Sequence, residues 1–139
     1  MKFVPPIPTD EIKDGEVAVR NLYISIDATN RVWISGVRTY MPPINPGDIM
    51  KGLGVAEVIF SKNASLKPGD LVLGLTYWQK YSVLPGKTLT KLPAQDPHPE
   101  NYVGVLGVSG LTAFFGFDKI GKLKAGEKVV VSAAAGAVG

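Results

Sequence analysis

The final six residues of the chain have the composition and spacing of a phosphate-binding loop. They run Ala134-Ala135-Gly136-Ala137-Val138-Gly139, a G-x-G-x-x-G pattern with alanine in place of the first glycine. In such a loop a strand leads into a helix whose N-terminus faces a pyrophosphate, and small residues let the backbone approach the phosphates. An ordinary glycine-rich turn after a strand is the alternative interpretation of the same residues.

The residues before this loop predict the strand that it requires. Val129, Val130 and Val131 are β-branched and apolar, as expected for a buried strand. A strand of a parallel sheet needs neighbouring strands and cover on both faces. No following helix or second parallel strand is predicted, so we expect residues 128–133 to form an unpaired apolar segment that is disordered or pairs with another segment.

Upstream of residue 95, short apolar runs alternate with turn residues, and this part of the chain contains eight of the 16 glycines and nine of the 11 prolines. This pattern predicts many short strands and is unsuited to a parallel βαβ design. The proline-rich residues 41–48 predict a loop, and a bulge is expected near Asn21. The strands are expected at residues 15–27, 52–62, 66–75, 79–84 and 88–92, and together they predict a small, partly open antiparallel barrel.

After residue 95 the pattern becomes helical. Residues 96–107 predict one short helix, with Asp96 as its N-cap and Pro97 at the first helical position. Residues 109–123 predict a second, with Ser109 as the N-cap and Gly121 as the glycine that ends it. The expected fold is therefore mainly β, with two short helices and one strand that leads into the phosphate loop.

Composition excludes several classes of function. The net charge of +3 is spread over scattered lysines and arginines, so no surface for nucleic acid is predicted. Cysteine is absent and His98 is the single histidine, which argues against a metal site. The N-terminus lacks the apolar region of a signal peptide, and no run approaches the ~20 residues that span a bilayer. We therefore expect a cytoplasmic protein that binds a small molecule and does not bind a membrane.

Five stretches carry a resemblance to a known family. They are NLYISID, GLGVAEVIFSKN, KPGDLVLGLTYWQKYSV, GVLGVSGLTAFFG and GEKVVVSAAAGAVG, in this order along the chain. Together they resemble the zinc-independent medium-chain dehydrogenases/reductases, in the branch of NADP-dependent alkenal and prostaglandin (leukotriene-type) reductases. Zinc-dependent alcohol dehydrogenase chemistry is excluded, because the Cys and His ligands are missing.

The resemblance implies a two-domain enzyme of which this chain is the N-terminal part. Residues 1–107 would form the GroES-like domain, and residues 108–139 the linker helix and the start of the Rossmann NADP-binding domain. It also implies a homodimer for the full-length protein. A free-standing GroES-like binding module is the alternative, although such a module has no use for a phosphate loop.

The resemblance also implies the reaction and the cofactor residues. Hydride passes from NADPH to the β-carbon of an enone or enal, or to a quinone, and the enolate oxygen needs hydrogen-bond donors. Gly136, Ala137, Val138 and Gly139 match the pyrophosphate loop. Thr112 is the first candidate, and Ser109 the second, for a polar contact beside the nicotinamide. Both can equally be ordinary helix-start residues.

The segment SIDATNRVW departs from the family pattern, which has a tyrosine where this chain has Thr29. Asn30 can instead donate an amide hydrogen bond to the enolate, and Tyr40 can replace the missing phenol, although either can be structural. Asp27 and Arg31 are expected to form an ion pair.

The two adjacent aromatic residues Tyr77 and Trp78 lie in the loop that the family places over the substrate. Such an amphipathic pair can line a pocket or cap one end of the barrel. The resemblance thus implies a substrate-binding role for both.

Overall fold

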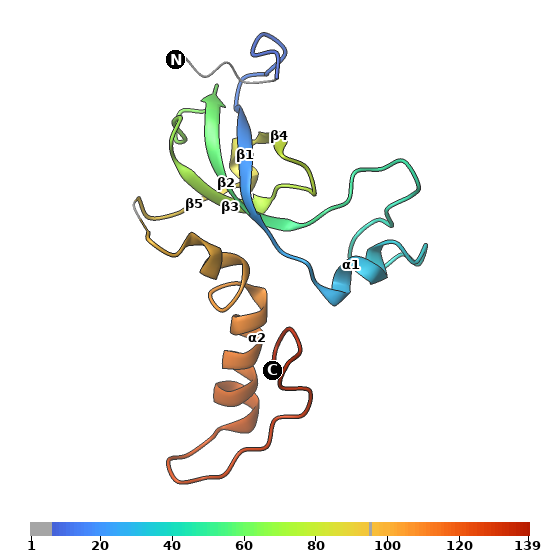
Figure 1. The fold of residues 1–139 in the computed structure, drawn as a ribbon, viewed down its shortest axis with the longest axis vertical. Helices are drawn as coiled ribbons and strands as arrows, with labels where there is room; N and C mark the ends of the chain where they lie inside the picture. Colours follow the sequence, from blue (N-terminus) through green and yellow to red (C-terminus); the bar gives the residue numbers. More distant parts are fainter. Residues whose placement is uncertain (1–6, 95) are drawn as a thin grey trace.

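The computed structural model describes residues 7–94 and 96–139, and its main element is one five-stranded antiparallel sheet (Figure 1). The strand order is β4-β1-β2-β3-β5, so the two edge strands are consecutive in sequence and are joined by a short 3₁₀ turn, Gly86–Thr88. This short connection brings the two edges together, consistent with a GroES-like domain. The predicted mainly β antiparallel fold is confirmed. The strands are β1 Glu16–Ile24, β2 Leu53–Ser61, β3 Leu71–Leu75, β4 Tyr81–Pro85 and β5 Thr90–Lys91.

The hydrophobic core lies inside this curved sheet. In β1 the consecutive residues Val17, Ala18 and Val19 are all buried, so this part of the strand is covered on both faces. Burial of a valine side chain stabilises the fold by about 1.5 kcal/mol or more. The core cluster consists of Val17, Val19, Ala56, Val58, Leu66, Val72 and Leu84.

Strand β1 changes partners along its length. It pairs with β4 only as far as Arg20, whereas its pairing with β2 continues to Ile24. The register with β2 shifts between Asn21 and Tyr23, which confirms the predicted bulge. From Asn21 onward one edge of the strand is therefore no longer paired with β4.

An ion pair joins the two strands at the far edge of the sheet. Nζ of Lys91, on β5, lies 2.7 Å from Oδ2 of Asp70, the residue before β3. The hydrogen bond from Lys91, followed by that from the backbone N–H of Lys67, lowers the pKa of Asp70 below its ordinary value of 3.8.

We expect Asp70→Asn to reduce the free energy of unfolding by about 0.5 kcal/mol at neutral pH. A lowered pKa stabilises the fold above the unfolded value of 3.8, and this stabilisation is lost as the pH falls through the folded-state pKa. Urea unfolding at pH 7 and at successively lower pH values below 4 measures the difference between variant and wild type. A difference that stays constant across this pH range would contradict the assignment, and Lys91→Met should lose the same pH dependence.

One helix was not expected from the sequence. Residues Ala28–Trp33 form α1, directly after β1, whereas the sequence was interpreted there only as a chemically important segment. The proline-rich residues 41–48 that follow contain no strand, as predicted.

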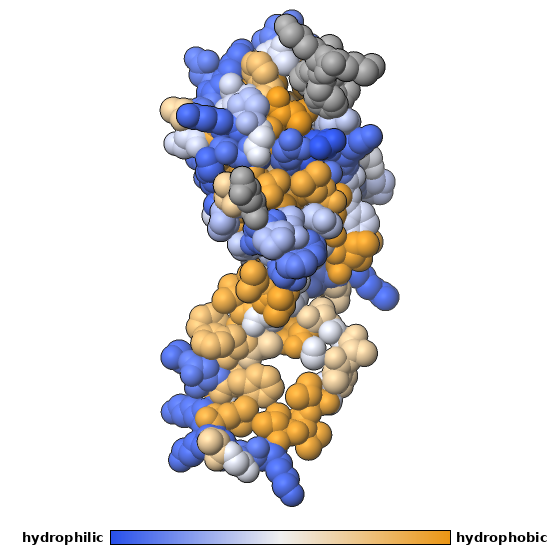
Figure 2. All heavy atoms as spheres, turned by 60° about the vertical axis from the view of Figure 1, so that its left-hand side comes forward, coloured by the Kyte–Doolittle hydropathy of each residue, from blue (hydrophilic) through white to orange (hydrophobic). Residues whose placement is uncertain are grey.

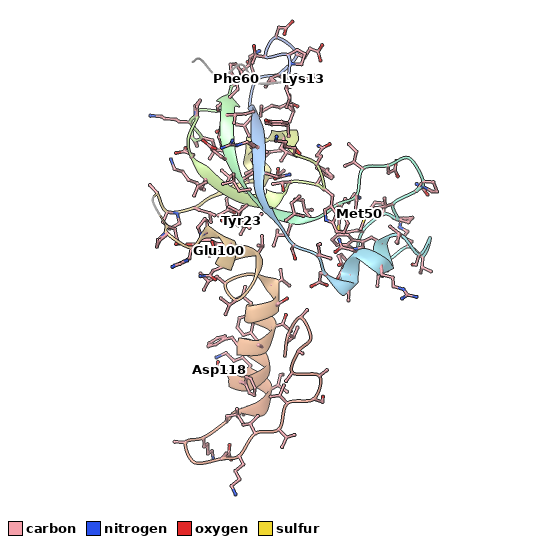
Figure 3. All side chains as sticks on the ribbon, in the orientation of Figure 1. Lys13, Tyr23, Met50, Phe60, Glu100 and Asp118 are labelled. Atoms are coloured by element: carbon pink, nitrogen blue, oxygen red, sulfur yellow. The ribbon has the colours of Figure 1, made fainter. Side chains whose placement is uncertain are left out.

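The two predicted helices are present, but their ends differ from the predictions. The first is a 3₁₀ helix, η2 (Pro99–Val103), whose N-cap is His98, so the cap at Asp96 was placed two residues too early. Asp96 instead accepts hydrogen bonds from the backbone N–H of His98 and from the hydroxyl of Tyr102, which together lower the pKa of its carboxyl. The helix η2 packs against β1 and β2, and Figure 3 shows it, labelled at Glu100, beneath the sheet.

The second is α2 (Val108–Phe115), which continues into a π-helical turn, η3 (Gly116–Gly121). Its N-cap is Gly107 and not Ser109, and the left-handed residue at its C-terminus is Lys122 and not Gly121. Both ends were predicted from residue preference alone. The observed N-cap lies two residues before the predicted one, and the observed left-handed residue lies one residue after the predicted glycine.

The predicted strand at Val129–Val131 is not formed. Residues 128–131 belong to no helix, strand or turn, and Val130 is 94% exposed. The physical reason is the one that the sequence suggested, since no parallel neighbour exists for it among the described residues. The chain runs back along α2, and Figure 2 shows apolar side chains gathered over this lower half of the molecule.

Residues 7–94 and 96–139 hold neither a membrane-spanning helix nor a metal-binding cluster. Within this part of the chain no helix is long and apolar enough to cross a bilayer. The same residues contain no group of three or more His, Cys, Asp or Glu side chains placed to hold a metal ion.

Candidate active site

The site is built around the N-terminus of α1, which a capping box fixes. Asp27 is the N-cap, and its Oδ1 accepts from the backbone N–H of Thr29 at 2.9 Å. In return the backbone N–H of Asp27 donates to Oδ1 of Asn30 at 2.7 Å. The expected ion pair between Asp27 and Arg31 is wrong, because the carboxylate caps the helix instead.

The side chain of Asn30 is buried, with 7% exposed, and both ends of its amide have backbone partners. Besides accepting from Asp27, it donates from Nδ2 to the carbonyl oxygen of Lys51 at 3.0 Å. Asn30 therefore ties α1 to the segment that enters β2. These contacts give it a positioning role for its neighbour Thr29.

We expect Asn30→Ala to lower the free energy of unfolding by about 2 kcal/mol, because it removes a cap and leaves the Lys51 carbonyl without its partner. Urea unfolding measures the loss. Asn45→Ala, which removes an exposed asparagine from the following loop, is the matched control and should change stability far less. A variant with wild-type stability but reduced turnover would instead indicate that Asn30 acts on the substrate.

The hydroxyl group of Tyr40 is arranged to donate a hydrogen bond. Nε1 of Trp33 donates to Oη of Tyr40 at 3.2 Å, so the phenol oxygen is an acceptor in this contact. Its own proton is left for another acceptor, and accepting one hydrogen bond polarises a hydroxyl for donating the next. The ring is 75% exposed, so a bound molecule can reach it.

A cavity of about 140 Å³ brings together residues that are distant in sequence. It lies between α1 and the start of α2, and we call it the α1–α2 cavity. Four of the predicted site residues line it, namely Thr29, Asn30, Tyr40 and Ser109, with Ser25 and Asp27 beside them.

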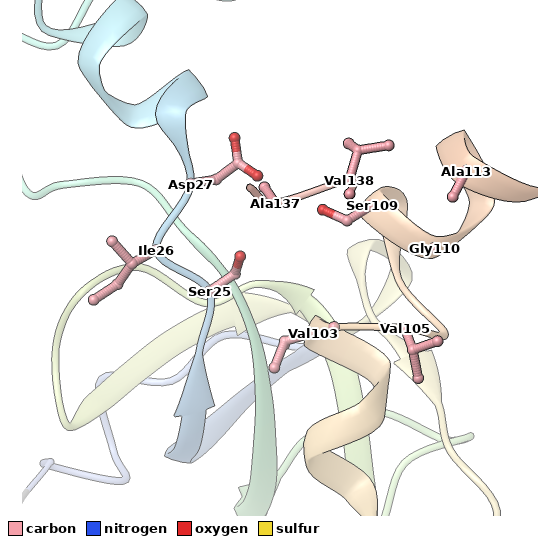
Figure 4. Close-up of a pocket in the computed structure, with 12 residues that line it drawn as sticks. Ser25, Ile26, Asp27, Val103, Val105, Ser109, Gly110, Ala113, Ala137 and Val138 are labelled. Atoms are coloured by element: carbon pink, nitrogen blue, oxygen red, sulfur yellow. The ribbon is translucent and has the colours of Figure 1, made fainter. Parts of the chain in front are cut away.

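A larger cavity of about 400 Å³ adjoins it and shares Ser25, Asp27 and Ser109. Residues 137–139 of the C-terminal tail form its other wall, so we call it the tail cavity. Figure 4 shows Ser25 and Asp27 on one side, facing Ser109 and Ala137 across the opening. The predicted cofactor residues Ser109, Ala137, Val138 and Gly139 therefore lie around one space.

Comparison with known proteins identifies the family of this chain. The family model described as the N-terminal domain of oxidoreductase matches residues 5–92. The chain belongs to the alkenal and prostaglandin reductase branch of the medium-chain dehydrogenases/reductases. The family resemblance predicted from the sequence is thus confirmed.

Several members of this branch are similar over most of the chain. Identity is 42% over 133 residues with the putative NADP-dependent oxidoreductase YfmJ of Bacillus subtilis, covering 96% of this chain and 39% of that protein. It is 41% with the NADP-dependent 2-alkenal reductase of Nicotiana tabacum, covering 90% of this chain and 37% of that protein. The crystal structure of CurA from Vibrio vulnificus in complex with NADPH superposes with a TM-score of 0.82 at 35% identity, covering 98% of this chain and 40% of that one. The chain thus spans about 40% of the length of these reductases.

Some predicted site residues of this reductase domain do not line these two cavities. The hydroxyl of Thr112 donates to the carbonyl oxygen of Val108 within α2, at 2.7 Å. Gly136 lies in the turn of the tail, where its N–H donates to the carbonyl oxygen of Ala133. Tyr77 packs against the hydrophobic core, whereas Trp78 lines a separate groove described below.

The residues around the tail cavity fit one end of NADPH better than the other. Ser25 and Ser109 offer hydroxyl groups that suit a carboxamide, and Gly110 and Ala113 leave room for a flat ring. The tail fits the pyrophosphate less well, because the backbone N–H of Gly136 already donates to the carbonyl oxygen of Ala133. The lining of the tail cavity therefore suits the nicotinamide end, whereas Gly136 offers no free backbone N–H to a phosphate in this arrangement.

Sequence reasoning missed Ser25 and Gly110, which line the tail cavity. The signal for Ser25 was the alternation Ile24, Ser25, Ile26, Asp27, which puts the two polar residues on one side of an extended segment. For Gly110 the local sequence carries no such signal. A Cβ at this position would overlap the carbonyl oxygen of Val105, a contact that only the folded chain reveals.

Proposed function

We propose that this chain is the substrate-side domain of an NADPH-dependent reductase that acts on activated C=C bonds of enones or enals, or on quinones. The division into residues 1–107 and 108–139 is part of this proposal. The observation that carries it is the exposed phenol of Tyr40, which accepts from Trp33 and stands with Thr29 in the α1–α2 cavity. The family supports the same chemistry, because the 2-alkenal reductase and curcumin reductase among its relatives are named for reducing such compounds.

The residues of this chain bind and polarise the substrate. When bound, NADPH supplies the hydride that adds to the β-carbon. The hydroxyl of Tyr40 donates a hydrogen bond to the substrate carbonyl oxygen, where negative charge develops, and the shorter hydroxyl of Thr29 is a second donor. Asn30, which was expected to be a donor, holds Thr29 in place through the helix cap. Ser109 and the tail residues Ala137, Val138 and Gly139 border the space assigned to the nicotinamide.

The exposed apolar face of α2 supports the presence of a further domain in the intact enzyme. Leu111, Phe114 and Phe115 are all about half exposed, which is unusual for side chains of this size on one helix. We assign this face to contact with the nucleotide-binding domain, to which Gly136 and Thr112 would also contribute. The homodimer and the cytoplasmic location remain predictions.

The experiment is oxidation of NADPH by the intact protein with a series of acceptors. The series contains a short enal, a phenyl-substituted enone, a quinone, an enoyl thioester and a saturated aldehyde. We expect turnover of the enal, the enone or the quinone and none of the saturated aldehyde. Binding of these compounds without any NADPH oxidation would reject the enzyme and favour a binding module.

A further inference from the structure

The side chain of Asn21 forms an unusual set of hydrogen bonds. Its Nδ2 lies within hydrogen-bond distance of three backbone carbonyl oxygens, those of Thr76 (3.2 Å), Tyr77 (3.0 Å) and Gln79 (2.6 Å). All three belong to the turn between β3 and β4. A primary amide is well suited to this task, since it is neutral and its two hydrogens can be shared among converging carbonyls.

This turn requires stabilising contacts, because it contains a residue in an uncommon backbone conformation. Tyr77 has a φ of 66°, in the left-handed region that bulky residues rarely occupy. The turn is supported from its other side by the buried hydroxyl of Ser82, which donates to the carbonyl oxygen of Thr76 at 2.6 Å. Asn21 thus completes a set of contacts that fixes the backbone from Thr76 to Gln79.

The same turn also holds Trp78 in place. The backbone N–H of Trp78 donates to the carbonyl oxygen of Met50 at 2.9 Å. Its indole lies over Gly52, where a Cβ would stand 2.5 Å from Nε1. The indole therefore occupies a place that exists only because residue 52 has no side chain.

Trp78 forms one wall of a groove of about 410 Å³, which we call the Trp78 groove. Leu22, Ile24 and Ile26 contribute aliphatic surface, and Lys80 is the one charged side chain of this described lining. Ile26, which is 80% exposed, also lines the tail cavity. In Figure 4 the side chain of Ile26 points away from the opening of the tail cavity, so Ile26 lies between the groove and that cavity.

We propose that Asn21 is a positioning residue for substrate recognition. By fixing the turn it holds Trp78 as the wall of a groove that receives the apolar end of the substrate. The aliphatic lining, the indole and Lys80 suit an aryl or alkyl chain that is neutral or carries a negative charge. This inference rests on the proposed function, because the reacting carbons of the same molecule would lie beyond Ile26.

The first test compares two substrates in the intact protein. We expect Asn21→Ala to raise the KM for 4-phenyl-3-buten-2-one roughly five-fold while kcat, and the KM for a four-carbon enal too short to reach the groove, stay unchanged. Asn63→Ala is the matched control, since Asn63 also caps a turn, through its Oδ1 and the N–H groups of Ser65 and Leu66, away from the groove. An equal rise of KM for both substrates would indicate a merely structural role and overturn the proposal.

The second test does not depend on catalysis. Hydrogen exchange at the backbone N–H of Trp78 should accelerate in Asn21→Ala and not in Asn63→Ala. Binding of 4-phenyl-3-buten-2-one should quench part of the tryptophan fluorescence of the wild type, and Trp78→Phe should abolish that part. An exchange rate in Asn21→Ala equal to that of the wild type would overturn the positioning role. This outcome can be read even if the protein reduces none of the compounds and the proposed function has failed. Quenching unchanged in Trp78→Phe would overturn the assignment of the groove.

Discussion

Tyr40→Phe is expected to lower kcat for enone reduction by about 10²-fold, with little change in KM. Loss of one donor to a developing oxyanion typically has an effect of this size, because the interaction is strongest in the transition state. Only the hydroxyl is removed, so the shape of the α1–α2 cavity is kept. The measurement is steady-state NADPH oxidation with a short enal, which does not require the Trp78 groove.

The control for this substitution is Tyr23→Phe. Tyr23 is exposed on β1, and its hydroxyl makes no hydrogen bond within residues 7–94 and 96–139, so the variant should keep wild-type kinetics. Thr29→Tyr, which restores the tyrosine of the family pattern, should recover part of the lost kcat in the Tyr40→Phe background. A wild-type kcat in Tyr40→Phe would exclude the phenol as the donor and leave Thr29 as the remaining candidate.

Gly54→Ala is expected to lower the free energy of unfolding by about 2–3 kcal/mol. A Cβ at residue 54 would overlap Oγ1 of Thr76 and stand 2.9 Å from the carbonyl oxygen of Tyr23. Strand β2 is paired on both sides, with β1 and β3, so it cannot shift to make room. Thr76 itself is fully buried, so its side chain cannot turn outward. The shift of the urea midpoint measures the effect.

Two further variants separate this steric cause from a general cost of replacing glycine. Gly116→Ala adds the same methyl group at a helical position with nothing within 4 Å, and it should leave stability unchanged or raise it slightly. Thr76→Ala removes a hydroxyl that has no partner within the described residues, and it should restore part of the stability of Gly54→Ala. No recovery in the double variant would contradict the proposed clash.

Much of the sheet could be predicted from sequence because its signals are local. The strands follow runs of apolar residues bounded by glycine and proline, such as Pro68-Gly69 before β3, and Gly69 has the positive φ that this turn needs. Helix α1 was missed although its signal is also local. Thr29 and Asn30 were interpreted as chemical groups, whereas Asp27 and Asn30 form a capping box, a signal that was present in the sequence.

The helix ends and the last strand show where local preference is insufficient. Ser109 is a good N-cap by residue type, yet the helix begins after Gly107, and no side-chain cap hydrogen bond fixes this start. Val129–Val131 has the composition of a strand but lacks a partner to pair with among the described residues. Residue preference alone therefore decides neither where a helix starts nor whether an apolar run pairs as a strand.

The sequence by itself determined the family, the antiparallel sheet and the residue types available for chemistry, because these depend on patterns of neighbouring residues. The tertiary structure alone decided which of those residues meet. It brought Thr29 and Tyr40 to Ser109 in one cavity, committed the amide of Asn30 to the backbone, and separated Tyr77 from Trp78. Such contacts depend on how the turns and the bulge of β1 direct the chain, and residues far apart in sequence carry no local signal of them.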